Sequence, residues 1–185
     1  SDLGGTLNSG GALAVNATGQ FVITGNNTVT ATSITNAGTL QSTATANFNG
    51  AGVLTNQGTL NVGTTGNVGA FSFDNFKQTG GQTVLSLGSS MTVTGTGAEF
   101  TFNGGFLGGS GTLTGNTINN ATFRPGFSPG VITITGNYTQ SAAATLLMET
   151  GGTAVSNYDR LLVTGTATLD GALTILPISP YTGSA

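Results

Sequence analysis

Residues Ile34 to Gln41 read ITNAGTLQ, and the chain nearly repeats this phrase twenty residues later as LTNQGTLN at Leu54 to Asn61. The repeat brings Asn56 twenty positions after Asn36. A fixed spacing of this length is typical of proteins built from stacked structural repeats, in which each repeat buries its apolar face against its neighbours. The repeated phrase therefore decides which folds have to be considered.

The composition is that of an uncharged, glycine-rich protein. The 185 residues include 32 Gly, 35 Thr and 17 Asn, only 5% of the residues are charged, and the formal net charge is −3. Average globular domains carry about 25% charged residues. Polar, glycine-rich tracts are often disordered. Because 37% of these residues are hydrophobic and recur at short intervals, we expect a folded β protein.

The apolar clusters are short and alternate with Thr or Ser before they stop at Gly or Asn, as in FVITGNN, TLNVG, MTVTG and VITITG. Alternation of this kind with Gly and Asn punctuation predicts strands and turns. The one helix candidate, Ser141 to Glu149, is also explained by a strand that follows a corner of small residues. The sequence therefore predicts an all-β fold.

A second repeat supports stacking of strands at the same period. The triplets at 92–94, 112–114 and 133–135 each place an aliphatic residue between two threonines, at spacings of 20 and 21 residues. Alternate side chains of a strand point to opposite faces, so Val93, Leu113 and Ile134 are expected to stack inward. Leu40 and Leu60 are expected to stack in the same way. The spacing predicts a parallel β-helix, or β-solenoid, with about 20–22 residues per coil.

The polar residues of the repeated phrase fit the corners of such a coil. Asn36 and Asn56 would lie one above the other, where side-chain amides can bond along the stack. Gly38 and Gly58 would supply tight corners in which a Cβ would clash. We interpret these residues as structural stacking positions.

The stretch from Phe123 to Ile175 is the most specific part of the chain. It contains PGFSPG at Pro125 to Gly130, GNYTQ at Gly136 to Gln140, YDRL at Tyr158 to Leu161, and VTGTATLDG at Val163 to Gly171. This ordered pattern resembles the distal passenger region of bacterial autotransporters and related haemagglutinin-like β-helical surface adhesins.

That resemblance implies a single-stranded right-handed parallel β-helix, exported and displayed on, or shed from, a bacterial surface. It implies no catalytic residue, since the pattern is scaffold in the family. The pattern usually continues past the point where this chain stops. We therefore expect residues 1–185 to form one solenoid domain that is a segment or a processed piece of a longer surface protein, with an extracellular location.

The chemistry available to the chain is narrow. Without His or Cys, the usual metal ligands, thiol nucleophiles and Ser-His triads are missing, and we expect no cofactor and no metal. Glu149, Asp159, Arg160 and Asp170 fall on successive C-terminal coils and are the only charged residues expected to gather. We interpret them as a solvated ion pair at a coil edge, so that an enzyme is not expected.

Several partners are excluded by composition. The three basic residues, Lys77, Arg124 and Arg160, cannot form a patch that neutralises several phosphates, which excludes nucleic acid. No run of about 18 apolar residues is present, so no transmembrane segment is expected.

The favoured function is a non-enzymatic extracellular surface or matrix protein. A rigid rod of this kind would act in adhesion or as a structural fibre subunit, for example in a biofilm matrix, by stacking end to end on other copies or on further repeats. Surface glycans and host or cell-surface molecules are the other expected partners. Two alternatives stay open: a polysaccharide-binding or polysaccharide-cleaving β-helix, and an ice-binding solenoid that uses its Thr-x-Thr pairs.

Overall fold

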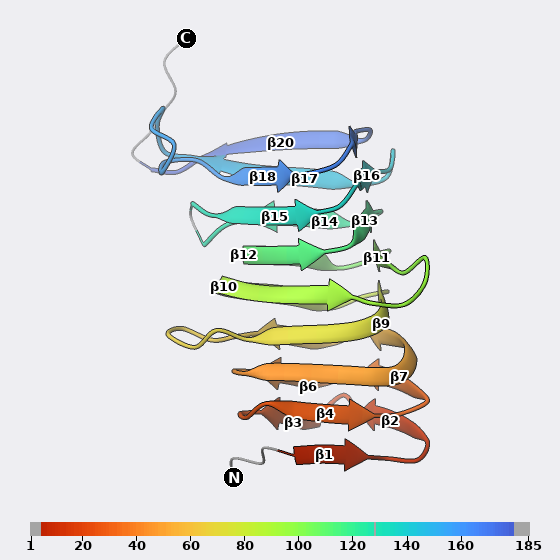
Figure 1. Cartoon of the computed structure of the whole chain (residues 1–185). Coiled ribbons are helices and arrows are strands. Elements are labelled where there is room, and N and C mark those ends of the chain that lie inside the picture. The colour runs from red at the N-terminus through yellow and green to blue at the C-terminus, as the bar shows by residue number, and fades with distance from the viewer. Residues whose placement is uncertain (1–4, 128, 180–185) are drawn as a thin grey trace.

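The computed structural model describes residues 5–127 and 129–179, which stack as strands into a rod with its two ends far apart (Figure 1). No helix occurs among these residues, and every pairing between named strands is parallel. In Figure 1 the near strands run in one direction and the far strands return while the chain climbs, which makes a right-handed coil. The predicted all-β parallel solenoid is confirmed.

The strands pair in three columns, which the chain visits in turn. The first column holds β1 (Gly5–Asn8), β4 (Asn27–Thr30), the first parts of β7 (Thr45–Asn56) and β9 (Ala70–Gln78), the second parts of β10 (Gln82–Val93) and β12 (Phe106–Thr114), β15 (Val131–Thr135) and β18 (Arg160–Val163).

The second and third columns complete each coil. The second holds β2 (Ala12–Val15), β5 (Ser33–Asn36), the second parts of β7 and β9, β11 (Glu99–Phe102), β13 (Asn116–Asn119), β16 (Tyr138–Gln140) and β19 (Ala167–Thr168). The third holds β3 (Gln20–Ile23), β6 (Thr39–Ser42), β8 (Thr59–Val62), the first parts of β10 and β12, β14 (Thr122–Pro125), β17 (Thr145–Thr150) and β20 (Ala172–Pro177).

The length of a coil varies along the rod. Paired residues are 20 positions apart at Leu40 and Leu60, 16 apart at Leu107 and Phe123, and 29 apart at Ile134 and Val163. The extra or missing residues fall in the corner turns. A corner can therefore lengthen while the strands on either side keep their register.

The lumen is filled by apolar side chains from alternate strand positions. The rings of Phe48, Phe71 and Phe73 stack with centroids 5.4–5.5 Å apart. The aromatic row continues through tilted and edge-to-face contacts that involve Phe76, Phe100, Phe102, Phe123 and Tyr138. Full burial of one such side chain contributes roughly 1.5–3 kcal/mol, so the lumen can offset the entropy lost by a glycine-rich chain.

The register places the aliphatic stacking residues as follows. Leu40 lies directly against Leu60, and both are fully buried. Leu113 lies against Ile134 in the same lumen row.

Val93 has a different neighbour from the expected one. It pairs with Phe73, and Met91 takes the position against Leu113. The equal spacing of the Thr-x-Thr triplets misplaced Val93 by two residues. The register of β10 shifts between Leu85 and Ser89, where the strand turns a corner, and no count along the sequence shows this shift.

The corner between the second and third columns contains a ladder of buried amides. Asn36 Nδ2 donates to Asn56 Oδ1 at 2.8 Å, and Asn56 Nδ2 donates to Gln78 Oε1 at 3.2 Å. The next residues of this corner leave no room for a side chain, because a Cβ on Gly58 would collide with the carbonyl oxygen of Gly38. Gly81 stands in the same relation to Gly58. The repeated phrase thus contains one amide and one glycine per coil that fit the coil below.

Candidate functional site

A buried carboxylate near the C-terminal end ties two coils together. Asp159 is only 4% exposed. Its Oδ1 accepts a hydrogen bond from the backbone N–H of Gly130, and its Oδ2 accepts one from the backbone N–H of Glu149, both at 2.8 Å. Because Gly130 ends the PGFSPG turn and Glu149 lies in β17, the carboxylate fastens that turn to a strand of the following coil.

The motif residues around Asp159 pack closely. A Cβ on Gly126 would collide with Asp159 Oδ1, and the backbone N–H of Gly126 donates to the carbonyl oxygen of Gly109 at 2.7 Å. Burial raises the pKa of Asp159 above its ordinary value, the hydrogen bonds from Glu149 and Gly130 oppose this rise, and the Glu149 charge adds to it. PGFSPG and YDRL therefore meet at one structural contact, which we call the Asp159 clasp.

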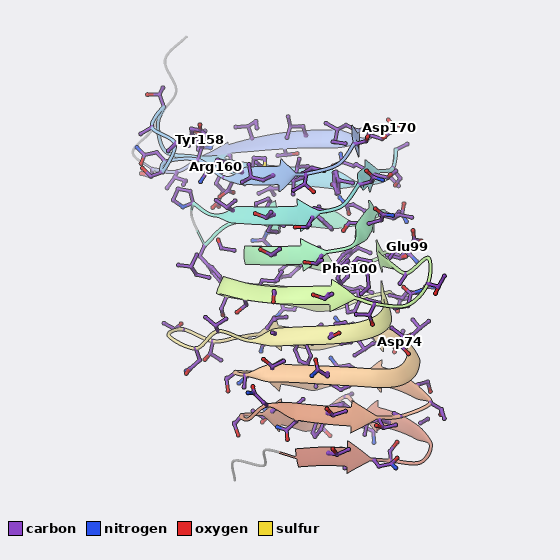
Figure 2. All side chains as sticks on the ribbon, in the orientation of Figure 1. Asp74, Glu99, Phe100, Tyr158, Arg160 and Asp170 are labelled. Atoms are coloured by element: carbon purple, nitrogen blue, oxygen red, sulfur yellow. The ribbon has the colours of Figure 1, made fainter. Side chains whose placement is uncertain are left out.

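The four charged residues expected to gather do so only in part. Asp159 and Glu149 come together in the clasp. Asp170 lies elsewhere, at the corner that follows β19, where its carbonyl oxygen accepts a hydrogen bond from Gln140 Nε2 at 2.6 Å. Figure 2 shows Asp170 on the opposite side of the rod from Tyr158 and Arg160. Arg160 begins β18, and its Nε is buried without a hydrogen-bond partner. The expected edge cluster is therefore incorrect for Asp170.

A groove of about 270 Å³ runs beside the clasp on the outside of the third column. Its floor is bare backbone at Gly108 and Gly109, between Val84 of one coil and Arg124 of another. The Arg124 guanidinium lies 4.8 Å from the centroid of the Phe106 ring.

The rim of this groove adds an exposed ring. Phe127, in the PGFSPG turn, is 60% exposed, and Leu147 and Glu149 complete the wall. The groove thus offers hydrogen-bond donors from an arginine beside apolar surfaces. The sequence reasoning did not single out Phe106, Arg124 or Phe127. The available signal was a large aromatic residue inside a turn rich in proline and glycine, where burial is not expected.

A larger concavity, of about 480 Å³, opens at the C-terminal end of the lumen. Leu146 and Met148 form part of its floor, and the last coil forms its wall. Leu169 and Leu173 of that coil are each 64% exposed although they face the lumen side. The end of the rod is therefore apolar and uncovered by the described residues.

The outer face of the first column carries rows of hydroxyl groups. Thr92, Thr114 and Thr135 are in register, and beside them Ser90, Thr112 and Thr133 form a parallel row. The second row is interrupted by Ala70 on one side and by Leu162 on the other. The paired rows therefore cover a short part of the rod.

Comparison of the chain with protein-family models, with curated proteins and with solved structures gives no match. Within residues 5–127 and 129–179, no three His, Cys, Asp or Glu side chains lie close enough together to hold a metal ion. The same part of the chain contains no helix that is long and apolar enough to cross a membrane.

Proposed function

We propose that this protein is a non-enzymatic component of a bacterial surface or extracellular matrix, a rigid β-solenoid rod that acts in adhesion or as a structural subunit. The observation that carries the proposal is the unbroken parallel pairing of all three strand columns around a filled lumen. Such a rod cannot bend without breaking hydrogen bonds in at least one column. Stiffness of this kind suits a spacer that presents a surface away from a cell.

The C-terminal motifs support this role. PGFSPG and YDRL resemble the passenger pattern of autotransporters and haemagglutinin-like adhesins, and in this fold they meet at the Asp159 clasp, which joins adjacent coils. The residues that carry the resemblance therefore have a scaffold role, as expected for a passenger. Surface glycans and host or cell-surface molecules are the partners that we propose for the sides of the rod.

Immunogold electron microscopy of the producing bacterium, with antibody raised against residues 5–179, tests the location. We expect gold particles on the outer surface or in the surrounding matrix, and reduced attachment of cells that lack the gene. Gold confined to the cytoplasm, or unchanged attachment and matrix in the deletion strain, would refute the proposal. Complementation with the intact gene is the control.

A saccharide-binding or saccharide-cleaving groove is the second candidate function. It is favoured by the grouping of Arg124, Phe106 and the exposed Phe127 beside Glu149 and the Asp159 clasp, since pockets of this type combine apolar walls with a few polar groups. The test is calorimetric titration and product analysis with a panel of neutral and acidic polysaccharides. Binding that is lost in Arg124→Ala and in Phe127→Ala supports the groove.

Cleavage needs a separate control. Loss of activity in both Glu149→Ala and Asp159→Ala, with retained binding, would support an acid–base role for this pair. Activity that survives both substitutions would exclude these carboxylates. Lys77→Ala, at a basic residue outside the groove lining, is the matched control for a general charge effect.

A further inference from the structure

The two ends of the rod are apolar in the same lumen rows. At the C-terminal end, Leu173 lies level with Leu146, and Ile175 lies level with Met148. Leu173 is 64% and Ile175 is 53% exposed, because no strand covers β20. These side chains have the lumen positions that are buried in interior coils.

The N-terminal coil presents the matching positions from the opposite side. Phe21 is in register with Leu40, and Leu13 is in register with Ile34. Both side chains pack against the core from one side. Residues 5–30 include no charged residue, so approach of another apolar surface meets no electrostatic barrier at this end.

The pairing registers align the two ends row by row. The third-column row that begins at Phe21 continues through successive pairings to Leu173, and the row that begins at Ile23 continues to Ile175. In the second column, the row that begins at Leu13 reaches Ala167. An N-terminal coil placed on the C-terminal coil would therefore oppose aliphatic or aromatic side chains in every one of these rows, and a large Leu13 would meet a small Ala167.

The amide ladder gives an independent sign of the same match. Interior coils carry Asn36, Asn56 and other amides in this lumen row, but the first coil has Val15 in register with Asn36. At the other end, Leu169 follows Thr168, which pairs with Thr139, so Leu169 comes level with the amide of Gln140. A junction would bring Val15 against Leu169 and would leave no amide without a partner at the new contact.

The chain cannot cover these ends from its own remaining residues. Four residues of the sequence precede Gly5 and six follow Ser179, whereas the shortest step between coils, from Leu107 to Phe123, is 16 residues. An occupant from another molecule is therefore required. A second copy provides three strands of the same direction and the same spacing, which no unrelated surface would supply.

We propose that the N-terminal coil of one copy stacks on the open C-terminal coil of another, so that all three strand columns continue across the junction. The inference rests on the proposed rod function and names its partner. Because the two contacting surfaces are different, the interface is heterologous and leaves a free end at each step, which produces an open filament rather than a closed dimer.

Two single substitutions test both the contact and its polarity. Leu13→Lys places a charge on the N-terminal surface, and Leu173→Lys places one on the C-terminal surface. Both side chains lie at an end of the rod, so the coils between them keep their packing. Thr114→Lys, on the exposed outer face of the first column, is the matched control. Circular dichroism and the thermal unfolding midpoint check that each 185-residue variant is folded.

Sedimentation velocity over a concentration series gives the readout. We expect concentration-dependent oligomers for the unchanged chain and for Thr114→Lys, and monomers for each end variant alone. An equimolar mixture of Leu13→Lys and Leu173→Lys should form dimers and nothing larger, since one free N-terminal and one free C-terminal surface remain.

Other outcomes would overturn the inference. Dimers of Leu13→Lys alone would show contact between two C-terminal ends, and a monomeric unchanged chain at every concentration would exclude end stacking. Neither result would affect the surface location measured by immunogold labelling, so failure of this inference and failure of the rod function can be distinguished.

Discussion

Asn36 Nδ2 donates to Asn56 Oδ1 across one coil, at 2.8 Å, and the same amide nitrogen donates to the carbonyl oxygen of Thr59 at 2.9 Å. One side chain therefore fastens its own corner both to the equivalent residue of the next coil and to the strand after that corner. Buried amides are stable in a lumen only when such partners exist. The ladder makes the stacking of coils specific, because an aliphatic lumen alone would tolerate slippage along the rod.

Replacement of Asn56 by Leu should destabilise the protein by about 2–4 kcal/mol, because it leaves buried polar groups of Asn36 and Gln78 without their hydrogen bonds. The control is Asn61→Ala, five residues later, where the side chain is only partly buried and its contact with Gln41 is long, at 3.5 Å. We expect the control to change stability by less than about 0.5 kcal/mol. Urea unfolding followed by circular dichroism measures both, and equal midpoints for the two variants would contradict a structural ladder.

Gly58→Ala should be strongly destabilising, by about 2 kcal/mol or more, since the added methyl group would meet rigid backbone at Ala37 and Gly38 rather than a movable side chain. Gly11→Ala is the matched control, because no atom lies within 4 Å of a Cβ at Gly11. Thermal unfolding of the two variants provides the comparison. A Gly58→Ala protein that melts with the unchanged chain would show that the corners can separate to accept side chains.

The fold could be predicted from the sequence because its period is repeated in the chain itself. At Asn36 and Asn56 the repeated phrase and the observed pairing coincide, since the coil between them has no insertion. At Val93 they differ, because the corner within β10 shifts the register and moves Met91 into the row of Leu113. Period counting therefore works between coils of equal length and fails where a corner gains or loses residues.

The candidate sites were less predictable for a different reason. Asp159 and Glu149 are neighbours because the YDRL segment folds back on β17, which the order of motifs only suggests. The groove at Arg124 depends on the absence of a side chain at Gly108, and a glycine in a chain with 32 glycines carries little information by itself. Which glycine leaves a hollow is decided by the register of three coils.

Phe76→Ala should cost about 3–5 kcal/mol, the range expected when a buried aromatic side chain is removed and a cavity remains. The Phe76 ring is fully buried and lies 5.5–5.8 Å from the rings of Phe100 and Phe102, so several neighbours lose contact at once. The control is Phe127→Ala, whose ring is mostly exposed and should contribute less than about 0.5 kcal/mol. Denaturant midpoints distinguish the two, and a small effect of Phe76→Ala would mean that the lumen collapses to fill the cavity.

The Asp159 clasp should make stability depend on pH in an unusual direction. The folded pKa of Asp159 is raised above the unfolded value of about 3.8, chiefly by burial, so the folded state holds its proton more tightly than the unfolded state. Stability from this residue is therefore fully present below the unfolded pKa and is lost as pH rises through the folded pKa.

Asp159→Asn removes this titration and keeps the size of the side chain. At neutral pH we expect the variant to lose about 1–3 kcal/mol, because an amide has one acceptor oxygen for the two backbone N–H groups of Gly130 and Glu149. As the pH falls from 7 to 3, the free energy of unfolding of the unchanged chain should rise relative to that of the variant, with the change confined to the window between the two pKa values. Other carboxylates titrate in both proteins and cancel in this difference. A difference that stays constant, or that shifts toward the variant on acidification, would show that the hydrogen bonds to the ionised carboxylate outweigh its burial.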